Sequence, residues 1–343
     1  MIRKKRANFL KQYLTNKIRV AEFGITNCCT AKCTFCGIWK QKEKVVISLE
    51  DGIRAIDKMA ELGVAHITMT GGDPLFNPHV YDFIKHCSEK HIHTLVLNAD
   101  ARLLTEANII KLKEAHTDFL CISIDSYDPA VVEASRGIPG LFAHIQAGIL
   151  LAKKHGISTM ASVLIWKNSH KHLEELFDKI NDMGFDYISV NYPEISKSTV
   201  YPLGGESVML TPKEIITAIE TVIKLKKTGK YHILNNVSSM KNIMNYLEHP
   251  SKAEYHCYGG SKVLFIDWFF NINPCMHLPK PLGSLWEMTN KDLKMIKCNQ
   301  CSMSWYRDFS MYFHGLKSIR PIFETAGLFN RLSAKPKKVK IAK

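Results

Sequence analysis

The chain has 343 residues, of which 46% are hydrophobic, and its formal net charge is +14. This length allows one large domain with a small appended one. The sequence contains no run of 18 apolar residues, so no membrane-spanning helix is predicted. Ten cysteines without an export signal argue against a disulfide framework, and they favour a reducing cytoplasm and metal or redox chemistry.

Strands alternate with helices along the first 195 residues. A short basic helix is expected within residues 2–17. The period of the apolar residues then predicts strands at 18–25, 66–70, 94–97, 119–124, 158–165 and 187–192, and helices at 49–62, 78–90, 105–115, 140–155 and 170–183. Six βα units are too few for a full eight-stranded barrel. The pattern therefore predicts an α/β fold built on a parallel sheet, a partial (β/α)6 barrel of the TIM type.

The chain is expected to divide into five segments. A basic N-terminal segment (1–17) precedes the partial barrel (18–195), and a helical connecting region (196–256) contains helices at 211–227 and 237–248. A small module (257–310) combines a helix with a β-hairpin, in which Asp267 and Trp268 separate two apolar runs. A basic tail (311–343) ends the chain.

The positive charge is concentrated at the two ends. Residues 1–17 carry six basic residues and no acid, and residues 317–343 carry eight basic residues and one acid, Glu324. Basic residues mixed with aromatic and aliphatic ones suit an anionic membrane surface. A nucleic-acid partner is the less favoured alternative, and solvated tails that aid solubility explain the charge equally well. We expect a cytoplasmic protein whose basic ends can contact the inner face of the membrane.

Three cysteines follow the first strand directly. Cys29, Cys33 and Cys36 stand in the spacing C-x3-C-x2-C. Three thiolates can hold three irons of a cubane cluster and leave the fourth iron open, whereas electron-carrying clusters usually have four cysteines. Zinc is an alternative, although the spacing lacks the paired C-x2-C of a zinc ribbon.

This stretch, with Phe35 just before the third cysteine, resembles the signature of the radical S-adenosylmethionine (radical SAM) superfamily. The resemblance implies a partial, open barrel whose 4Fe-4S cluster binds the amino and carboxylate groups of S-adenosylmethionine. It also implies reductive cleavage of that cofactor to a 5′-deoxyadenosyl radical.

Two further motifs are similar to cofactor-binding segments of the same family. Gly71-Gly72-Asp73-Pro74 resembles the GGEP segment, which implies that it receives the ammonium of S-adenosylmethionine; Asp73 replaces the commoner Glu. Ser123, together with Arg136 in the loop that follows, resembles an SxD … RG pattern. The resemblance implies that both side chains hold the carboxylate, which a guanidinium can grip through two bonds. A surface cation is the alternative for Arg136.

A second set of four cysteines lies near the C-terminus. Cys257, Cys275, Cys298 and Cys301 have the layout C-x17-C … C-x2-C. Four thiolates would complete a cluster without an open iron, and zinc is again the alternative. The layout resembles the twitch module, the shorter relative of the SPASM domain, which implies an auxiliary 4Fe-4S cluster.

Candidate substrate residues stand at the end of the sixth strand. Tyr192 and Glu194 are the weak candidates for catalysis, and Glu22, His66 and Asn191 could also face the barrel interior. The sequence predicts an enzyme that abstracts a substrate hydrogen for an oxidation or a bond-forming maturation step, assisted by the second cluster. A two-cluster electron carrier or redox sensor is the alternative. A small molecule, a lipid-linked molecule or a peptide remains open as substrate, with flavodoxin or ferredoxin as reductant.

Overall fold

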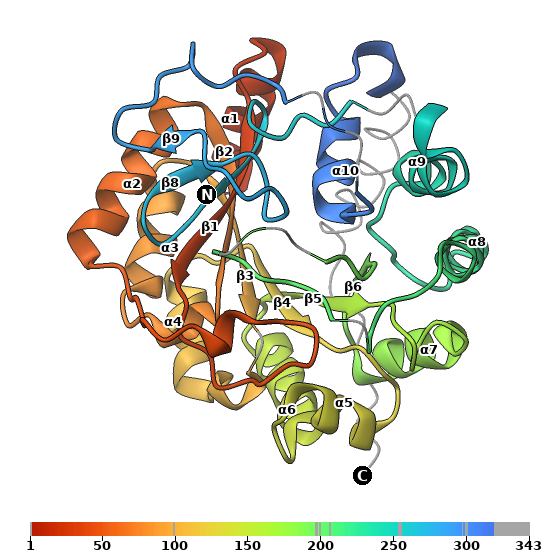
Figure 1. Cartoon of the computed structure of the whole chain (residues 1–343). Coiled ribbons are helices and arrows are strands. Elements are labelled where there is room, and N and C mark those ends of the chain that lie inside the picture. Colours follow the sequence, from red (N-terminus) through yellow and green to blue (C-terminus); the bar gives the residue numbers. More distant parts are fainter. Residues whose placement is uncertain are drawn as a thin grey trace.

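The computed structural model describes residues 2–98, 100–195, 198, 200–205, 207–252, 256–296, 298 and 301–318 (Figure 1). The basic tail predicted at the C-terminus lies outside the described residues from 319 onward.

The six predicted strands form a parallel sheet in chain order. They are β1 (Arg19–Thr26), β2 (Val64–Gly71), β3 (His93–Asn98), β4 (Phe119–Ser123), β5 (Ser158–Leu164) and β6 (Tyr187–Asn191). The sheet has the order β6-β5-β4-β3-β2-β1-β7-β8-β9, so β6 and β9 lie at opposite ends. The predicted α/β fold with an open, partial barrel is confirmed.

Helices cover the outside of this sheet (Figure 1). The five predicted between the strands are α2 (Leu49–Glu61), α3 (Val80–Glu89), α4 (Glu106–Glu114), α6 (Leu141–Lys154) and α7 (Leu173–Met183), and α8 (Pro212–Lys227) and α9 (Val237–Glu248) follow β6. Local chemistry sets their starts: the Ser48 hydroxyl accepts a hydrogen bond from the Asp51 amide, and Thr211 and Glu214 form a capping box. Single 3-10 turns lie at Ile38–Lys40, Pro74–Phe76, Ala101–Leu103, Pro250–Lys252 and Gly315–Ser318.

Helix α5 (Pro129–Arg136) was not predicted, whereas α10 (Ser304–Met311) is the helix expected in the small C-terminal module. The prediction that Arg136 lies in a loop is wrong, because it is the last residue of α5. Asp128 caps the start of α5, Pro129 takes the first helical position, and Gly137 ends the helix with φ 63°. This helix fixes the direction in which Arg136 leaves the backbone.

The C-terminal hairpin continues the barrel sheet. Strand β7 (Val263–Ile266) runs parallel to β1, with Val263 opposite Val20. Strand β8 (Asn271–Asn273) returns antiparallel to β7, and β9 (Gly283–Ser284) is antiparallel to β8. The small module is thus joined to the barrel through hydrogen bonds between backbones.

The N-terminal helix α1 (Ile2–Leu14) packs near the starts of the strands. Asn8 donates a hydrogen bond to the carbonyl of His91, just before β3, over 3.1 Å. Lys5 is fully buried, and its Nζ lies 2.6 Å from a carboxylate oxygen of Asp118, just before β4. One charge of the basic N-terminal segment is therefore neutralised inside the fold. Among the described residues, no helix combines the length and the apolar character needed to cross a bilayer.

Candidate functional site

A cavity of about 250 Å³ collects most of the predicted site residues. They reach it from the cysteine loop after β1 and from the carboxyl ends of β2, β4 and β6, where parallel α/β folds place their chemistry. The predicted residues that line it are Cys29, Cys33, Phe35, Cys36, Gly71, Gly72, Ser123, Arg136, Tyr192 and Glu194. Asp73 is fully buried beneath the cavity, and the other four cysteines line a neighbouring one.

The first three cysteines all line the cavity, with Cys33 buried and Cys29 and Cys36 half-buried. Burial raises the pKa of Cys29 to about 12, and the nearby charges of Asp73, Cys33 and Cys36 add to this increase. Burial likewise raises the pKa of Cys36 to about 11 and raises that of Cys33. Without a metal these thiols hold their protons, whereas coordination to a metal deprotonates a thiol outright. The three thiols therefore suit a metal group whose positive charge stabilises the deprotonated sulfurs.

The arrangement of these side chains is not that of a single zinc site. A single zinc ion holds its ligands about 2.0–2.3 Å away, so the ligand atoms must converge closely. Among the described residues, no three His, Cys, Asp or Glu side chains converge in this way. A cubane cluster places each thiolate on a different iron and therefore spaces the sulfurs more widely. The position of the three thiols in the wall of one cavity suits a cluster whose open iron faces that cavity.

Gly71 and Gly72 hold the end of β2 against the cysteine loop. A Cβ on Gly71 would lie 1.9 Å from the carbonyl oxygen of Thr26, and one on Gly72 would lie 2.1 Å from that of Cys28. The Gly72 amide donates to the Thr26 carbonyl over 2.8 Å, and the Asp73 amide donates to the Cys28 carbonyl over 2.9 Å. The lack of a side chain at both glycines thus allows the backbone of the cysteine loop to approach them closely.

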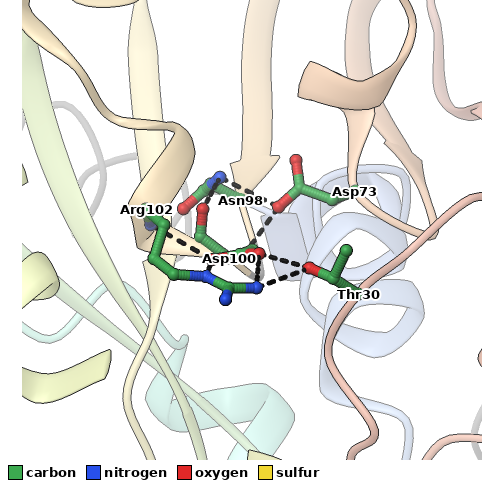
Figure 2. Close-up of polar contacts among 5 residues, drawn as sticks. All are labelled: Thr30, Asp73, Asn98, Asp100 and Arg102. Atoms are coloured by element: carbon green, nitrogen blue, oxygen red, sulfur yellow. Dashed lines mark hydrogen bonds and ion pairs between the residues drawn. The ribbon is translucent and has the colours of Figure 1, made fainter. Parts of the chain in front are cut away.

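Asp73 organises the loops below the cavity (Figure 2). One carboxylate oxygen accepts hydrogen bonds from the Asn98 side chain over 2.9 Å and from the Asp100 amide over 2.7 Å. The other oxygen accepts from the Leu75 amide over 3.0 Å. Asp73 therefore ties the end of β2 to the end of β3.

Asp100 extends this network to the cysteine loop (Figure 2). Its carboxylate pairs with Arg102 over 2.7 Å and accepts a hydrogen bond from the hydroxyl of Thr30, which follows Cys29. Burial opposes ionisation of Asp100, but the hydrogen bonds from Arg102 and Thr30 outweigh it and hold its pKa below the usual value. The network thus connects Thr30, next to the first cysteine, to acids at the ends of β2 and β3.

Arg136 is buried and paired with Asp125. Its guanidinium lies 5.3 Å from the ring centroid of Phe35, and one terminal nitrogen lies 3.9 Å from the sulfur of Cys33. The buried Nε has no partner within the described part of the chain. Arg136 is therefore no surface cation, and it keeps one donor for a ligand of the cavity. Ser123 is half-buried at the same wall.

The second cavity is lined by all four C-terminal cysteines. Burial raises the pKa of Cys275 and of Cys301 to about 12, and the charge of Cys257 contributes to both increases. The Gly259 amide points at the sulfur of Cys257 over 3.3 Å, and the Leu278 amide at that of Cys275 over 3.4 Å. Hydrogen bonds to ligand sulfurs are typical of iron–sulfur sites. These residues also fit a four-iron cluster.

Tyr192 and Glu194 differ in their surroundings. The Tyr192 hydroxyl is buried without a hydrogen-bond partner among the residues described, and burial raises its pKa. Glu194 accepts a hydrogen bond from the Ser302 hydroxyl over 2.5 Å and another from the Ser302 amide. Because Ser302 follows Cys301, Glu194 connects the end of β6 to the loop of the second cysteine set.

Residues of α10 complete the site and were missed. Tyr306 and Met303 line both cavities, and the Tyr306 hydroxyl donates a hydrogen bond to Glu22 in β1 over 2.7 Å. The apolar residues of Ser304–Met311 repeat at helical spacing directly after the last cysteine, which is the signal that could have placed them. Tyr201 also lines the first cavity, from the segment after β6.

Comparisons with known proteins find relatives that align with most of this chain. An AdoMet-dependent heme synthase of Methanosarcina barkeri (strain Fusaro / DSM 804) is 23% identical over 295 residues, which span 82% of this chain and 83% of that protein. The antilisterial bacteriocin subtilosin biosynthesis protein AlbA of Bacillus subtilis (strain 168) is 23% identical over 264 residues, or 76% of this chain and 55% of that protein.

Solved structures share the fold. SuiB of Streptococcus suis bound to S-adenosylmethionine aligns with a TM-score of 0.65 and 15% identity over 83% of this chain and 68% of that one. Native anSMEcpe with bound AdoMet aligns with a TM-score of 0.62 and 13% identity over 91% of this chain and 98% of that one. The profile described as the Radical SAM superfamily matches residues 23–180, which contain the first three cysteines, both glycines and Arg136. Residues 23–180 therefore belong to the radical SAM superfamily.

Proposed function

We propose that the protein is an enzyme that reductively cleaves S-adenosylmethionine in the first cavity and abstracts a hydrogen atom from a substrate bound there. The observation that carries this proposal is the convergence of three cysteines, two glycines and a buried arginine on one cavity. When bound, the cofactor and the cluster supply a 5′-deoxyadenosyl radical.

The chain's own residues have distinct parts in this proposal. Cys29, Cys33 and Cys36 hold the cluster, and Arg136 and Ser123, which line the same cavity, receive the carboxylate of the cofactor. Asp125 neutralises part of the Arg136 charge and orients its guanidinium. The largely buried walls exclude water, which would otherwise quench a radical and screen the ion pair.

The second cysteine set is proposed to hold an auxiliary 4Fe-4S cluster that accepts an electron from the substrate. Met303 and Tyr306 line both cavities, so these two residues form part of the wall between the two sites. An oxidation or a bond-forming maturation step follows from this arrangement. A peptide or a small molecule with an unreactive C–H bond is the expected substrate, and a flavodoxin or ferredoxin the expected reductant.

The test is formation of 5′-deoxyadenosine. The protein would be reconstituted anaerobically with iron and sulfide and given dithionite and S-adenosylmethionine. Wild type should release 5′-deoxyadenosine, Cys33→Ala should not, and Cys28→Ala is the matched control because Cys28 lies next to Cys29 but does not line the cavity. If wild type releases none with both clusters present and with cell extract added, the electron-carrier alternative holds instead.

A contact between α1 and an anionic membrane surface is a separate proposal. Arg3, Lys4 and Lys11 are exposed on α1 together with Leu10 and Leu14, and the helix contains no acid. Cations beside apolar side chains suit anionic lipid. Wild type should sediment with phosphatidylserine vesicles, and Leu10→Ser with Leu14→Ser should not. RNA binding without vesicle binding would overturn this proposal.

A further inference from the structure

Glu22 is a buried acid in the wall of the first cavity. It stands in the middle of β1, opposite Thr68 of β2 and Phe265 of β7, and its side chain is 6% exposed. Burial raises its pKa to about 8, although the hydrogen bond from Tyr306 acts in the opposite direction. The carboxyl group can therefore lose and regain a proton close to neutral pH, and its ionised form is the one that can accept a proton.

Tyr306 connects Glu22 to the four-cysteine site. Its hydroxyl donates to Glu22 over 2.7 Å and accepts a hydrogen bond from the Met276 amide over 3.2 Å. Met276 is the residue after Cys275, which lines the second cavity. A continuous hydrogen-bonded chain thus runs from the first cavity to the backbone beside a cluster ligand.

The other acids of the first cavity are already engaged. Asp125 pairs with Arg136 and accepts the Leu164 amide over 2.8 Å. Glu194 accepts both the amide and the hydroxyl of Ser302. Among the described residues, Glu22 is the cavity acid that meets neither a cation nor a backbone amide.

His66, Tyr201 and Tyr306 keep one protonation state while Glu22 changes. On β2, burial lowers the pKa of His66 to about 3, so this histidine is neutral. Burial raises the pKa of Tyr306 on α10 and of Tyr201 above the cavity, so both hydroxyls keep their protons. Asp267 follows β7 and is engaged with Asn271 and Asn273. The other titratable groups lining the cavity are Cys29, Cys33, Cys36, Asp125, Arg136, Tyr192 and Glu194.

We propose, on the basis of the function proposed above, that Glu22 accepts the proton that the substrate loses on oxidation and that Tyr306 couples this proton to the four-cysteine site. The substrate carries a C–H bond next to an X–H group, where X is oxygen, nitrogen or sulfur. Its C–H hydrogen atom passes to the 5′-deoxyadenosyl radical and yields 5′-deoxyadenosine. The carbon radical then gives one electron to the oxidised auxiliary 4Fe-4S cluster while the X–H proton passes to the Glu22 carboxylate. A C=X double bond forms, and the substrate has lost two electrons and two protons in total.

The coupling can be measured without a substrate. A group that binds a proton when a one-electron centre is reduced shifts the reduction potential by about 59 mV per pH unit, because each unit is a tenfold change in proton concentration. We would measure the potential of the auxiliary cluster against pH by electron paramagnetic resonance in the reconstituted full chain. The same chain with Cys33→Ala identifies the signal that belongs to this cluster.

In wild type the potential should fall with this slope over the pH range in which Glu22 is ionised when the cluster is oxidised and protonated when it is reduced. Glu22→Gln should remove the slope, and Tyr306→Phe should reduce it by at least half. Glu61→Gln, on the exposed end of α2, should follow wild type. A flat wild-type curve, or the same slope in Glu22→Gln, would overturn the proposal. Tyr306→Phe serves as the second variant if Glu22→Gln fails to fold.

The test of Glu22 can fail independently of the test of the proposed enzyme activity. If wild type forms 5′-deoxyadenosine but Glu22→Gln keeps the slope, the assignment of Glu22 fails alone. If the slope depends on Glu22 but no 5′-deoxyadenosine ever forms, the proposed enzyme activity fails and the proton coupling stands.

Discussion

Arg136 and Asp125 form an ion pair in the wall of the first cavity, with side-chain exposures of 5% and 2%. Two charges removed from water to this extent depend on each other, since either one alone would be buried without compensation. The pair also leaves Nε of Arg136 free for a ligand within the described structure.

Asp125→Asn should therefore destabilise the protein before any cofactor binds. Loss of one partner of a buried ion pair costs about 3–5 kcal/mol, which urea unfolding of the cluster-free protein would measure. Asp128→Asn is the control, because Asn also caps a helix well and the cost should be small. Arg136→Met combined with Asp125→Asn should recover part of the loss. Equal unfolding free energies for wild type and Asp125→Asn would contradict the importance of the pair.

Asp73→Glu would introduce the residue more common in the resembling motif. Asp73 is fully buried and holds the Leu75 amide, the Asp100 amide and Asn98 at once, so one extra methylene cannot be accommodated without displacing a partner. We expect a loss of about 1–3 kcal/mol in unfolding free energy. Asp82→Glu, on the exposed face of α3, should change little. A neutral Asp73→Glu would mean that the loops around Asp73 adapt freely.

The stability of the cluster-free protein should depend on pH through Glu22. Its pKa is about 8 in the folded chain and 4.5 as the ordinary value, so between these limits the folded state binds a proton that the unfolded state does not. The contribution to stability is complete below pH 4.5 and is lost as the pH rises to about 8, at up to about 1.4 kcal/mol per pH unit. Thermal melting of wild type and Glu22→Gln across this range should show curves that diverge. Parallel curves would contradict the raised pKa.

Lys5→Met should destabilise the fold, unlike the loss of other charges from the N-terminal segment. The Lys5 ammonium is buried against Asp118, and although burial opposes ionisation of Asp118, His93 and Lys5 hold its pKa at about 2. Removing the cation leaves a buried carboxylate, at a cost of about 3–5 kcal/mol. Lys4→Met, one residue away and exposed, is the control. If both variants melt at the wild-type temperature, the Lys5–Asp118 ion pair does not anchor α1 in solution.

The barrel could be predicted from the sequence because local signals mark the start and end of its strands and helices. Apolar strands ending in turn residues, caps such as Ser48, and glycines such as Gly63 and Gly184 at helix ends are all readable over a few residues. The same signals are present at α5, in Asp128, Pro129 and Gly137, so this helix was predictable although a loop was expected around Arg136.

Other parts of the site depend on contacts between distant residues. Nothing near Glu22 in the sequence indicates that Tyr306, far along the chain, supplies its hydrogen bond. Likewise, the basic residues at the N-terminus form one run in the sequence, although packing buries Lys5 and exposes Lys4. Which of several similar side chains is buried is decided by tertiary structure, and this determines both pKa and role.

The parallel pairing of β1 with β7 has a consequence for synthesis of the protein on the ribosome. Strand β1 acquires β2 as a partner early, but its other edge stays open until Val263–Ile266 has been translated. An unpaired apolar strand edge is a site for aggregation, and long-range parallel pairing forms slowly. Pausing or truncation before β7 should therefore yield nascent chains that depend on chaperones, even though every residue of the radical SAM domain has already been made.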